Sequence, residues 1–183
     1  MTKPLILPIN GKTPKIHDTA FIAPGAIIIG DVEIGPQASV WYNCVLRGDI
    51  HRISVGARSN IQDGTVIHVE GDHDGDGGCP TIIGEDVLIG HMVMLHGCTL
   101  MDRAFIGLGT IVMDRCVVEG DAMLAAGAML TPGKRIPARQ LWSGRPAKFM
   151  RDLDDAAITG MQSGVTHYVE AAQKHRAALA GLG

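Results

Sequence analysis

The chain has 183 residues, of which 46% are hydrophobic but only 4% aromatic, and its formal net charge is −3. This length supports one domain with a substantial core. The charge excludes the basic surface that is typical of nucleic-acid binding. The longest apolar run, residues 122–126, is far shorter than the ~20 residues that a helix needs to span a bilayer. We therefore expect no nucleic acid and no membrane among its partners.

The first eight residues lack the apolar stretch of a secretory signal. The four cysteines contain no CxxC pair, and a chain of this size does not need disulfides. We expect a cytoplasmic protein whose cysteines are small core residues.

A six-residue repeat organises most of the chain. Ile, Leu or Val recurs at every sixth position within residues 22–46, 55–67, 83–95 and 100–130. Four residues after each of these anchors, the side chain is usually small or β-branched. A helix period of 3.6 or a strand period of two does not explain this spacing. A coil of three short strands does, with one anchor per strand pointing inward.

The repeat predicts an all-β solenoid, a parallel β-helix of hexapeptide repeats that occupies residues 1–136 in about five to six coils. Stacked coils place the anchors in continuous internal columns, and such a narrow prism has little room for aromatic rings. Residues 69–80 are acidic, rich in glycine and without a core pattern. This composition predicts a protruding loop.

The six-residue repeat ends at residue 136. We expect residues 138–150 to form a connection that crosses back over the prism. From Asp152 onward the pattern is helical, because acidic residues suit a helix N-terminus and one face is apolar. The residues of that face are Ile158, Met161, Val165, Tyr168, Val169 and Ala172. We expect residues 137–183 to form a connecting segment and a C-terminal α-helix, packed on the prism or on a neighbouring subunit.

Three of the eight histidines, His68, His91 and His96, lie inside the repeat and should point outward, because the inward slots are aliphatic. The hexad count predicts His68 and His91 on neighbouring coils, with His96 on the next face. Three neutral imidazoles with an open fourth position suit a catalytic Zn²⁺ ion. One rigid convex prism does not easily converge three ligands from two faces on one ion, whereas a subunit interface could, if a neighbouring subunit supplied the missing ligand. Histidines that only form hydrogen bonds are the alternative.

Other polar residues follow anchors on earlier coils. Arg47 and Asp49 are interpreted either as a surface ion pair or as a structural pair in a subunit interface. Gln62 occupies the slot that His68 and His96 also use. This equivalence places the Gln62 amide one strand away from the water of any metal ion held there.

Five stretches resemble the γ-class carbonic anhydrase family, and more closely its short bacterial branch. They are residues 45–49 (VLRGD), 60–64 (NIQDG), 66–69 (VIHV), 89–98 (IGHMVMLHGC) and 143–148 (SGRPAK). The order and spacing of these blocks match the family from about residue 21 to residue 153.

The resemblance implies a left-handed β-helix, a rare exception to right-handed crossovers, assembled as a homotrimer. It also implies Zn²⁺, or alternatively Fe²⁺ or Co²⁺, at each subunit interface. By that resemblance, His68 and His96 of one chain and His91 of its neighbour hold the metal ion. Arg47 and Asp49 match the family's interface pair.

The activity that the resemblance implies is reversible hydration of CO₂ to bicarbonate, by a hydroxide that zinc generates when it lowers the pKa of water from about 15.7 toward ~7. Gln62 and Asp63 match residues that orient this water and brace the site. Tyr168 resembles a tyrosine of the family's C-terminal helix that reaches toward the site. The candidates for the family's proton shuttle are Glu70 and His73, and the unperturbed pKa of histidine, ~6.5, suits that role.

The sequence departs from the family pattern at Ile50, where the prototype carries a glutamate, so weak or latent hydration activity is one alternative. Another is a different enzyme on the same fold, an acyl-CoA thioesterase or a hexapeptide acyltransferase. An acyltransferase needs one catalytic histidine and a pantetheine groove, whereas a thioesterase can use the same metal site. The third alternative is a non-catalytic trimeric accessory protein.

Overall fold

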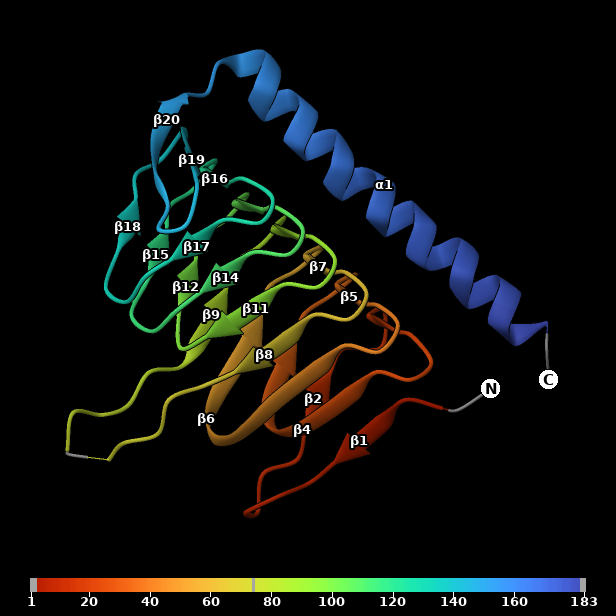
Figure 1. Ribbon diagram of the computed structural model, residues 1–183. Helices are drawn as coiled ribbons and strands as arrows, with labels where there is room; N and C mark the ends of the chain where they lie inside the picture. The colour runs from red at the N-terminus through yellow and green to blue at the C-terminus, as the bar shows by residue number, and fades with distance from the viewer. Residues whose placement is uncertain (1–2, 74, 182–183) are drawn as a thin grey trace.

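The computed structural model describes residues 3–73 and 75–181 of the chain. It is a parallel β-solenoid with one long C-terminal helix (Figure 1). Met1 and Thr2 of the predicted β-helix, Asp74 of the predicted loop, and Leu182 and Gly183 of the predicted C-terminal segment lie outside the described residues.

Most strands are two or three residues long, as a coil with frequent corners requires. The elements are, in chain order, β1 (Leu5–Leu7), β2 (Lys15–Ile16), β3 (Phe21–Ile22), β4 (Ile27–Ile34), β5 (Ser39–Val40), β6 (Val45–Val55), β7 (Asn60–Ile61), β8 (Val66–His68), β9 (Thr81–Ile83), β10 (Leu88–Ile89), β11 (Met94–His96), β12 (Thr99–Leu100), β13 (Phe105–Ile106), β14 (Ile111–Val112), β15 (Val117–Val118), β16 (Met123–Leu124), β17 (Met129–Leu130), β18 (Arg135–Ile136), β19 (Gln140–Ser143), β20 (Lys148–Asp152) and α1 (Asp155–Ala180).

The strands stack in parallel into three faces of a prism. The first face contains β6, β8, β11, β14 and β17, and the second contains β6, β9, β12, β15 and β18. The third face contains β3, β5, β7, β10, β13, β16 and β19. The long strand β6 belongs to two faces because it bends around a corner: Leu46 pairs with Ile67 of β8, and Val55 pairs with Ile83 of β9.

The anchors of the repeat form the core, as predicted. Every anchor from Ile28 to Leu130 is at most 2% exposed, and Ile22 at the first coil is partly buried. Full burial of each such side chain stabilises the fold by ~1.5–3 kcal/mol. The third face has seven parallel strands, one more than the predicted five to six coils supply, because β19 continues it.

Residues 138–150 are not the plain crossing connection that the sequence predicted. In β19, Leu141 pairs in parallel with Met123 of the preceding coil, and β20 then returns antiparallel against β19. This hairpin lies at the end of the prism opposite β1 (Figure 1). A hairpin changes both strand direction and residue spacing, so a six-residue count does not detect it.

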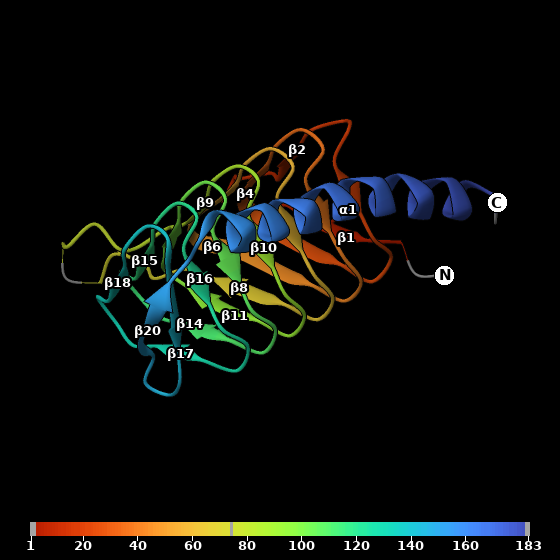
Figure 2. The same cartoon turned by 90° about the horizontal axis from the view of Figure 1, so that it is seen from above.

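Helix α1 begins where the acidic residues predicted. Asp154 is the N-cap, and its carboxylate accepts a hydrogen bond of 2.8 Å from the backbone N–H of Ala157. The side chains of Met161, Val165 and Ala172 are buried. The helix lies along the third face of the same prism and runs back toward the first coils (Figures 1 and 2). It is not apolar enough to span a membrane.

Aromatic rings gather outside the prism, between the third face and α1. Trp41 packs edge-to-face against Phe21 and against Tyr168, each at 5.4 Å between ring centroids. Such pairs contribute ~0.5–1.5 kcal/mol beyond the area they bury. Arg176 adds hydrogen bonds to the carbonyls of residues 18–20. These contacts hold the helix, and with it the Tyr168 ring, in a fixed position.

The predicted loop leaves the prism between β8 and β9 and extends away from it (Figure 1). Its base is closed by two backbone hydrogen bonds between Glu70 and Cys79, of 3.0 and 2.9 Å. An ion pair between Asp76 and Arg115 ties the loop to a later coil. The start of the loop is therefore anchored on the first face.

Candidate functional site

Two of the three repeat histidines face each other on the first face. His68 in β8 and His96 in β11 are paired in register, and His68 Nδ1 lies 3.1 Å from His96 Nε2. This corrects the expectation that His91 is the neighbour of His68. Ile67 is one full coil from Leu95, because the loop falls within a single hexad step and the count across it was one step too long.

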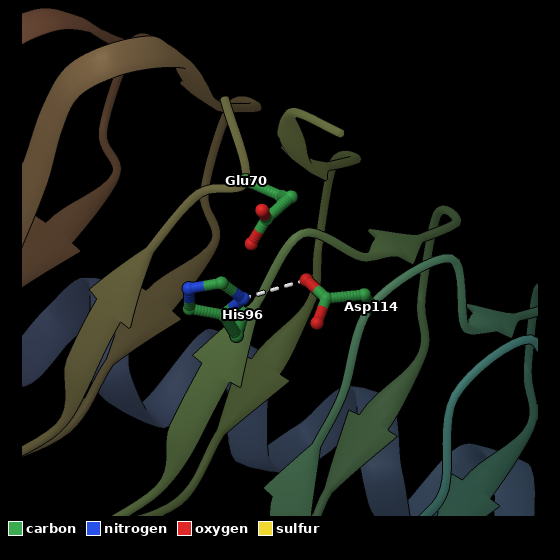
Figure 3. Close-up of side chains that lie close together, drawn as sticks. All are labelled: Glu70, His96 and Asp114. Atoms are coloured by element: carbon green, nitrogen blue, oxygen red, sulfur yellow. Dashed lines mark hydrogen bonds and ion pairs between the residues drawn. The ribbon is translucent and has the colours of Figure 1, made fainter. Parts of the chain in front are cut away.

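Each of these two rings also contacts a carboxylate through its other nitrogen. His68 Nε2 lies 3.0 Å from Asp49 Oδ1, and His96 Nδ1 lies 2.6 Å from Asp114 Oδ1 (Figure 3). A carboxylate only accepts hydrogen bonds, so the proton of each neutral ring lies on the nitrogen beside it. The two remaining nitrogens are then both acceptors at 3.1 Å, an arrangement that calls for a positive charge between them.

The separation of these two nitrogens fits a tetrahedral metal ion. Zn–N bonds of ~2.0–2.1 Å at tetrahedral angles place two nitrogen ligands ~3.3–3.4 Å apart. The observed 3.1 Å between His68 Nδ1 and His96 Nε2 is close to this value. Imidazole nitrogen is also a ligand that Zn²⁺ prefers. The donor set of these residues therefore fits part of a zinc site.

Asp49 connects this histidine pair to Arg47, its partner in the ion pair that the sequence predicted. The carboxylate of Asp49 accepts a hydrogen bond of 2.6 Å from Arg47 through Oδ2 while its Oδ1 contacts His68. Partial burial works against ionisation, but the hydrogen bonds from Arg47 and His68 hold the pKa of Asp49 below its ordinary value. Asp49 thus stays charged and fixes the orientation of the His68 ring.

His91 lies on a different corner, in the turn after β10, and does not meet the other two histidines within one chain. Its Nδ1 is 2.9 Å from Asp63 Oδ2, and its Nε2 is 3.4 Å from the Tyr168 hydroxyl. The His91 side chain is 47% exposed. Burial, together with the Asp63 charge, raises the pKa of Tyr168, so the hydroxyl keeps its proton.

Beside His91 a groove of about 430 Å³ opens between the third face and α1. Its lining is mostly apolar and consists of Gln62, Leu88, Gly90, His91, Phe105, Ile106, Gly107, Leu108, Met123, Ala126 and Tyr168. Gln62 is only 4% exposed, and its amide nitrogen donates to Asn60 Oδ1 at 3.0 Å. The structure therefore groups Gln62, Asp63, His91 and Tyr168 at one corner.

The loop brings both predicted proton-shuttle candidates to the first face. Glu70 Oε1 lies 3.1 Å from His73 Nε2, and the His73 side chain is 68% exposed. The Glu70 carboxylate, one ring nitrogen of His96 and one oxygen of Asp114 lie within 4.8 Å of one another (Figure 3). Glu70 therefore stands between the histidine pair and an imidazole that faces solvent.

Asp114 is a further residue of the site that the sequence prediction does not include, although the length of a coil contains a signal for it. Asp114 follows β14, whose residues pair with those of β11, so it lies one coil beyond His96. The link between Asp63 and His91 has the same origin, since Ile61 pairs with Ile89 and the two residues occupy equivalent slots. An outward carboxylate one coil from a histidine was thus a detectable pattern.

Comparisons with known proteins agree with this architecture. The family model described as bacterial transferase hexapeptide (six repeats) matches residues 13–48. Gamma carbonic anhydrase 2, mitochondrial, of Arabidopsis thaliana is 44% identical over 93% of this chain and 61% of its own length. The carbonic anhydrase of Geobacillus kaustophilus is 40% identical over 94% of this chain and 92% of its own. The chain belongs to the γ-class carbonic anhydrase family. It spans only about three fifths of the length of the first Arabidopsis relatives.

A solved structure of similar shape is named after a different activity. The crystal structure of a putative acetyltransferase from Bacillus cereus has a TM-score of 0.91 and 37% identity, and covers 97% of this chain and 99% of its own. The γ-class family and the hexapeptide acyltransferases therefore share a scaffold, and the choice between their activities depends on the site.

Proposed function

We propose that the protein is a metal-dependent γ-type carbonic anhydrase that hydrates CO₂ reversibly at the subunit interfaces of a homotrimer. The observation that carries the proposal is the facing pair of free ring nitrogens on His68 and His96. The third imidazole, His91, lies at another corner, where its side chain is 47% exposed and its Nε2 is 3.4 Å from the Tyr168 hydroxyl. A neighbouring copy of the chain is then the source of the third ligand.

The residues around each histidine support a metal site rather than a chance cluster. When bound, Zn²⁺ supplies the field that lowers the pKa of water from about 15.7 to ~7, and Fe²⁺ or Co²⁺ can bind imidazole as well. Asp49, Asp114 and Asp63 each contact one ring nitrogen of a different histidine. Carboxylates in this position fix the tautomer of a ligating histidine and raise its basicity.

The groove at the His91 corner suits the substrate. CO₂ is small and uncharged, and the surface beside His91 is mostly apolar. Gln62 and Tyr168 are the polar side chains that flank His91 there, apart from Asp63. In our proposal the Gln62 amide and the protonated Tyr168 hydroxyl orient the reacting water, and Asp63 braces His91.

Hydration converts CO₂ and water into bicarbonate and one proton, and the proton has to leave the site. We assign its exit to Glu70 and His73, which are in contact at 3.1 Å. Glu70 lies beside His96, and His73 is mostly exposed. A carboxylate near the site and an imidazole at the surface form a path of two proton acceptors to solvent.

The test combines metal analysis with a stopped-flow CO₂ hydration assay on His68→Ala, His91→Ala and His96→Ala. We expect each replacement to remove both bound metal and activity. His17→Ala, which changes a histidine that contacts Thr19 instead, is the matched control and should keep both. Metal retained by all three variants would refute the site. Metal binding without hydration by the unmutated protein would favour the non-catalytic accessory role.

A second candidate function is acyl transfer or thioester hydrolysis with His91 as general base. It is favoured by one observation: the Asp63–His91 pair lies at an apolar groove of about 430 Å³, far larger than CO₂ requires. For this activity His91→Ala abolishes acyl-CoA turnover while His68→Ala leaves it intact. Loss of activity in both variants favours the shared metal site.

A further inference from the structure

We propose that Asn10, in the hairpin between β1 and β2, is a positioning residue for the proposed metal site. It acts through Asp49 on the ring of His68. The side-chain amide of Asn10 donates a hydrogen bond of 3.1 Å to the backbone carbonyl of Asp49, 39 positions further along the chain. The proposal rests on the metal site of the proposed function, but part of its test needs no metal.

Asp49 begins a segment that bulges out of the ladder between β4 and β6. The two strands pair in register as far as Gly48 of β6 and again from Ile53, while β4 advances by only one unpaired residue. Residues 49–52 therefore stand opposite that single residue. A bulge re-aims the side chains that it carries and leaves its extra residues outside the regular ladder. The position of Asp49 thus depends on contacts from outside these two strands.

Two segments that are distant in sequence contact this bulge. Asn10 contacts the carbonyl of Asp49. In the loop that leaves the prism, the carbonyl oxygen of Gly77 lies 3.2 Å from Nε2 of His51. Of these two contacts, the one from Asn10 falls on the residue whose carboxylate meets His68. The hairpin is therefore the segment that can fix the Asp49 carboxylate from outside the bulge.

The hairpin presents the Asn10 amide in a defined geometry. Ile9 and Lys12 exchange two backbone hydrogen bonds, of 3.0 and 2.9 Å. The two residues between them, Asn10 and Gly11, have φ angles of 51° and 71°. Positive φ at both central positions defines a type I′ turn, for which Asn-Gly is a preferred sequence. The Lys12 ammonium also lies 3.4 Å from the Asp31 carboxylate of β4. Asn10 is thus presented by a turn that its own sequence stabilises.

The hydrogen bond from Asn10 starts a series of contacts that ends at His68. Asp49 Oδ2 accepts a hydrogen bond of 2.6 Å from Arg47, and Asp49 Oδ1 lies 3.0 Å from His68 Nε2. Both contacts need the carboxylate in one place, which follows from the placement of the Asp49 backbone. Loss of the Asn10 contact frees that backbone and weakens the hold on His68. The ring can then carry its proton on Nδ1, the nitrogen that faces His96, where a proton prevents metal binding.

The first test measures the tautomer of His68 in the metal-free protein. Asn10→Gly keeps the positive φ of the turn and removes the side-chain donor. Lys12→Gln, which breaks the ion pair of the same hairpin, is the matched control. We follow the histidine rings by ¹⁵N nuclear magnetic resonance, with His68→Ala to assign the signals. Circular dichroism checks that every variant is folded.

We expect the proton of His68 on Nε2 in the unmutated protein and in Lys12→Gln. In Asn10→Gly the population with the proton on Nδ1 should rise at least ~3-fold, the size of effect that one hydrogen bond supports. An unchanged His68 tautomer in Asn10→Gly would overturn the proposal.

The second test measures zinc affinity by competition with a chromophoric chelator. We expect Asn10→Gly to bind zinc ~3–10-fold more weakly, less than the ~10–100-fold typical of a carboxylate that itself contacts a ligand. Lys12→Gln should bind zinc as the unmutated protein does. In an Asp49→Asn background, Asn10→Gly should weaken binding by less than ~2-fold further, because its effect passes through the Asp49 carboxylate.

A general loosening of the hairpin makes different predictions. It gives equal losses of zinc affinity in Asn10→Gly and Lys12→Gln, and additive losses in the double variant with Asp49→Asn. Either result would overturn the proposal. If the His68 tautomer follows Asn10 while zinc binding survives in His68→Ala, the proposed metal site is wrong and the positioning of His68 by Asn10 stands.

Discussion

Neighbouring residues on the first face of the prism have opposite surroundings. Ile67 and Leu95 point inward, belong to one continuous column and have no exposed surface. His68 and His96, the next residue along each strand, point outward and contact only polar groups through their ring nitrogens. The same two strands thus carry an inner column of aliphatic anchors, which the repeat requires. They also carry His68 and His96 of an outer row of polar side chains, Asp49, His68, His96 and Asp114, which the repeat does not require.

This difference separates two kinds of requirement on the sequence. The inner column is defined by volume and apolarity, so many aliphatic residues can satisfy it. The outer row is defined by donors and acceptors, and each member depends on the next: Asp49, His68, His96 and Asp114 form an unbroken chain of contacts. Truncating a side chain of the inner column should lower the stability of the fold, and truncating a side chain of the outer row should weaken metal binding.

The largest expected effects come from one adjacent pair of residues. Leu95→Ala leaves a cavity in the core and should lower the free energy of unfolding by ~2–5 kcal/mol. His96→Ala should change that free energy by less than ~1 kcal/mol in the metal-free protein. It should instead reduce metal affinity by more than the ~10–100-fold typical of an outer carboxylate. Urea denaturation and metal titration of both variants make the comparison, and equal loss of stability would contradict it.

A smaller effect on metal affinity is expected at the carboxylates that contact the histidine rings. Asp114→Asn keeps the shape of the side chain but weakens its hold on His96 Nδ1. We expect metal affinity to fall by ~10–100-fold with no change in stoichiometry. Competition with a chromophoric chelator measures this. An affinity equal to that of the unmutated protein would mean that Asp114 does not orient His96.

The sequence predicts the inner column far better than the outer row. The period of six predicts which anchors point inward, because an inward position requires only an aliphatic side chain. Ile28, Val40 and Leu124 meet this requirement and are buried. The contacts within the outer row depend on which strands of neighbouring coils are paired. The loop at residues 69–80 makes the number of hexads between those strands hard to count. The predicted neighbour of His68 is therefore wrong, and the prediction does not include Asp114. The hairpin β19–β20 was missed because it leaves the repeat.

The proton path should give an effect of about tenfold on hydration. Glu70→Gln keeps the size of the side chain but cannot accept a proton, so turnover in weak buffer should fall by ~10-fold or more. Added imidazole should restore turnover, because a diffusible base can replace a missing proton acceptor. Stopped-flow assays at several imidazole concentrations measure this. A loss that imidazole does not restore would remove Glu70 from the path.

The smallest expected effect is a difference in reactivity between two cysteine thiols, Cys44 and Cys79. Burial raises the pKa of Cys44 to about 12, so in the native protein at pH 8 it should not react with iodoacetamide. Cys79 is partly exposed and should react first. Because the folded state holds the Cys44 proton more tightly, its contribution to stability is complete below pH ~8.5 and is lost as pH rises toward 12. Mass spectrometry of the alkylated protein counts the modified thiols, and rapid native labelling of Cys44 would contradict its buried position.

The central claim is that one site combines His68 and His96 of one chain with His91 of another, and mixed trimers test it most directly. His68→Ala and His91→Ala are each expected to be inactive alone. When the two are co-expressed, random assembly should restore about a quarter of the interfaces, since one chain then supplies an intact His68–His96 pair and the next an intact His91. Co-expression of His68→Ala with His96→Ala should restore none. Recovery of metal and hydration in the first mixture alone is the predicted result, and no recovery in either mixture would contradict a shared site.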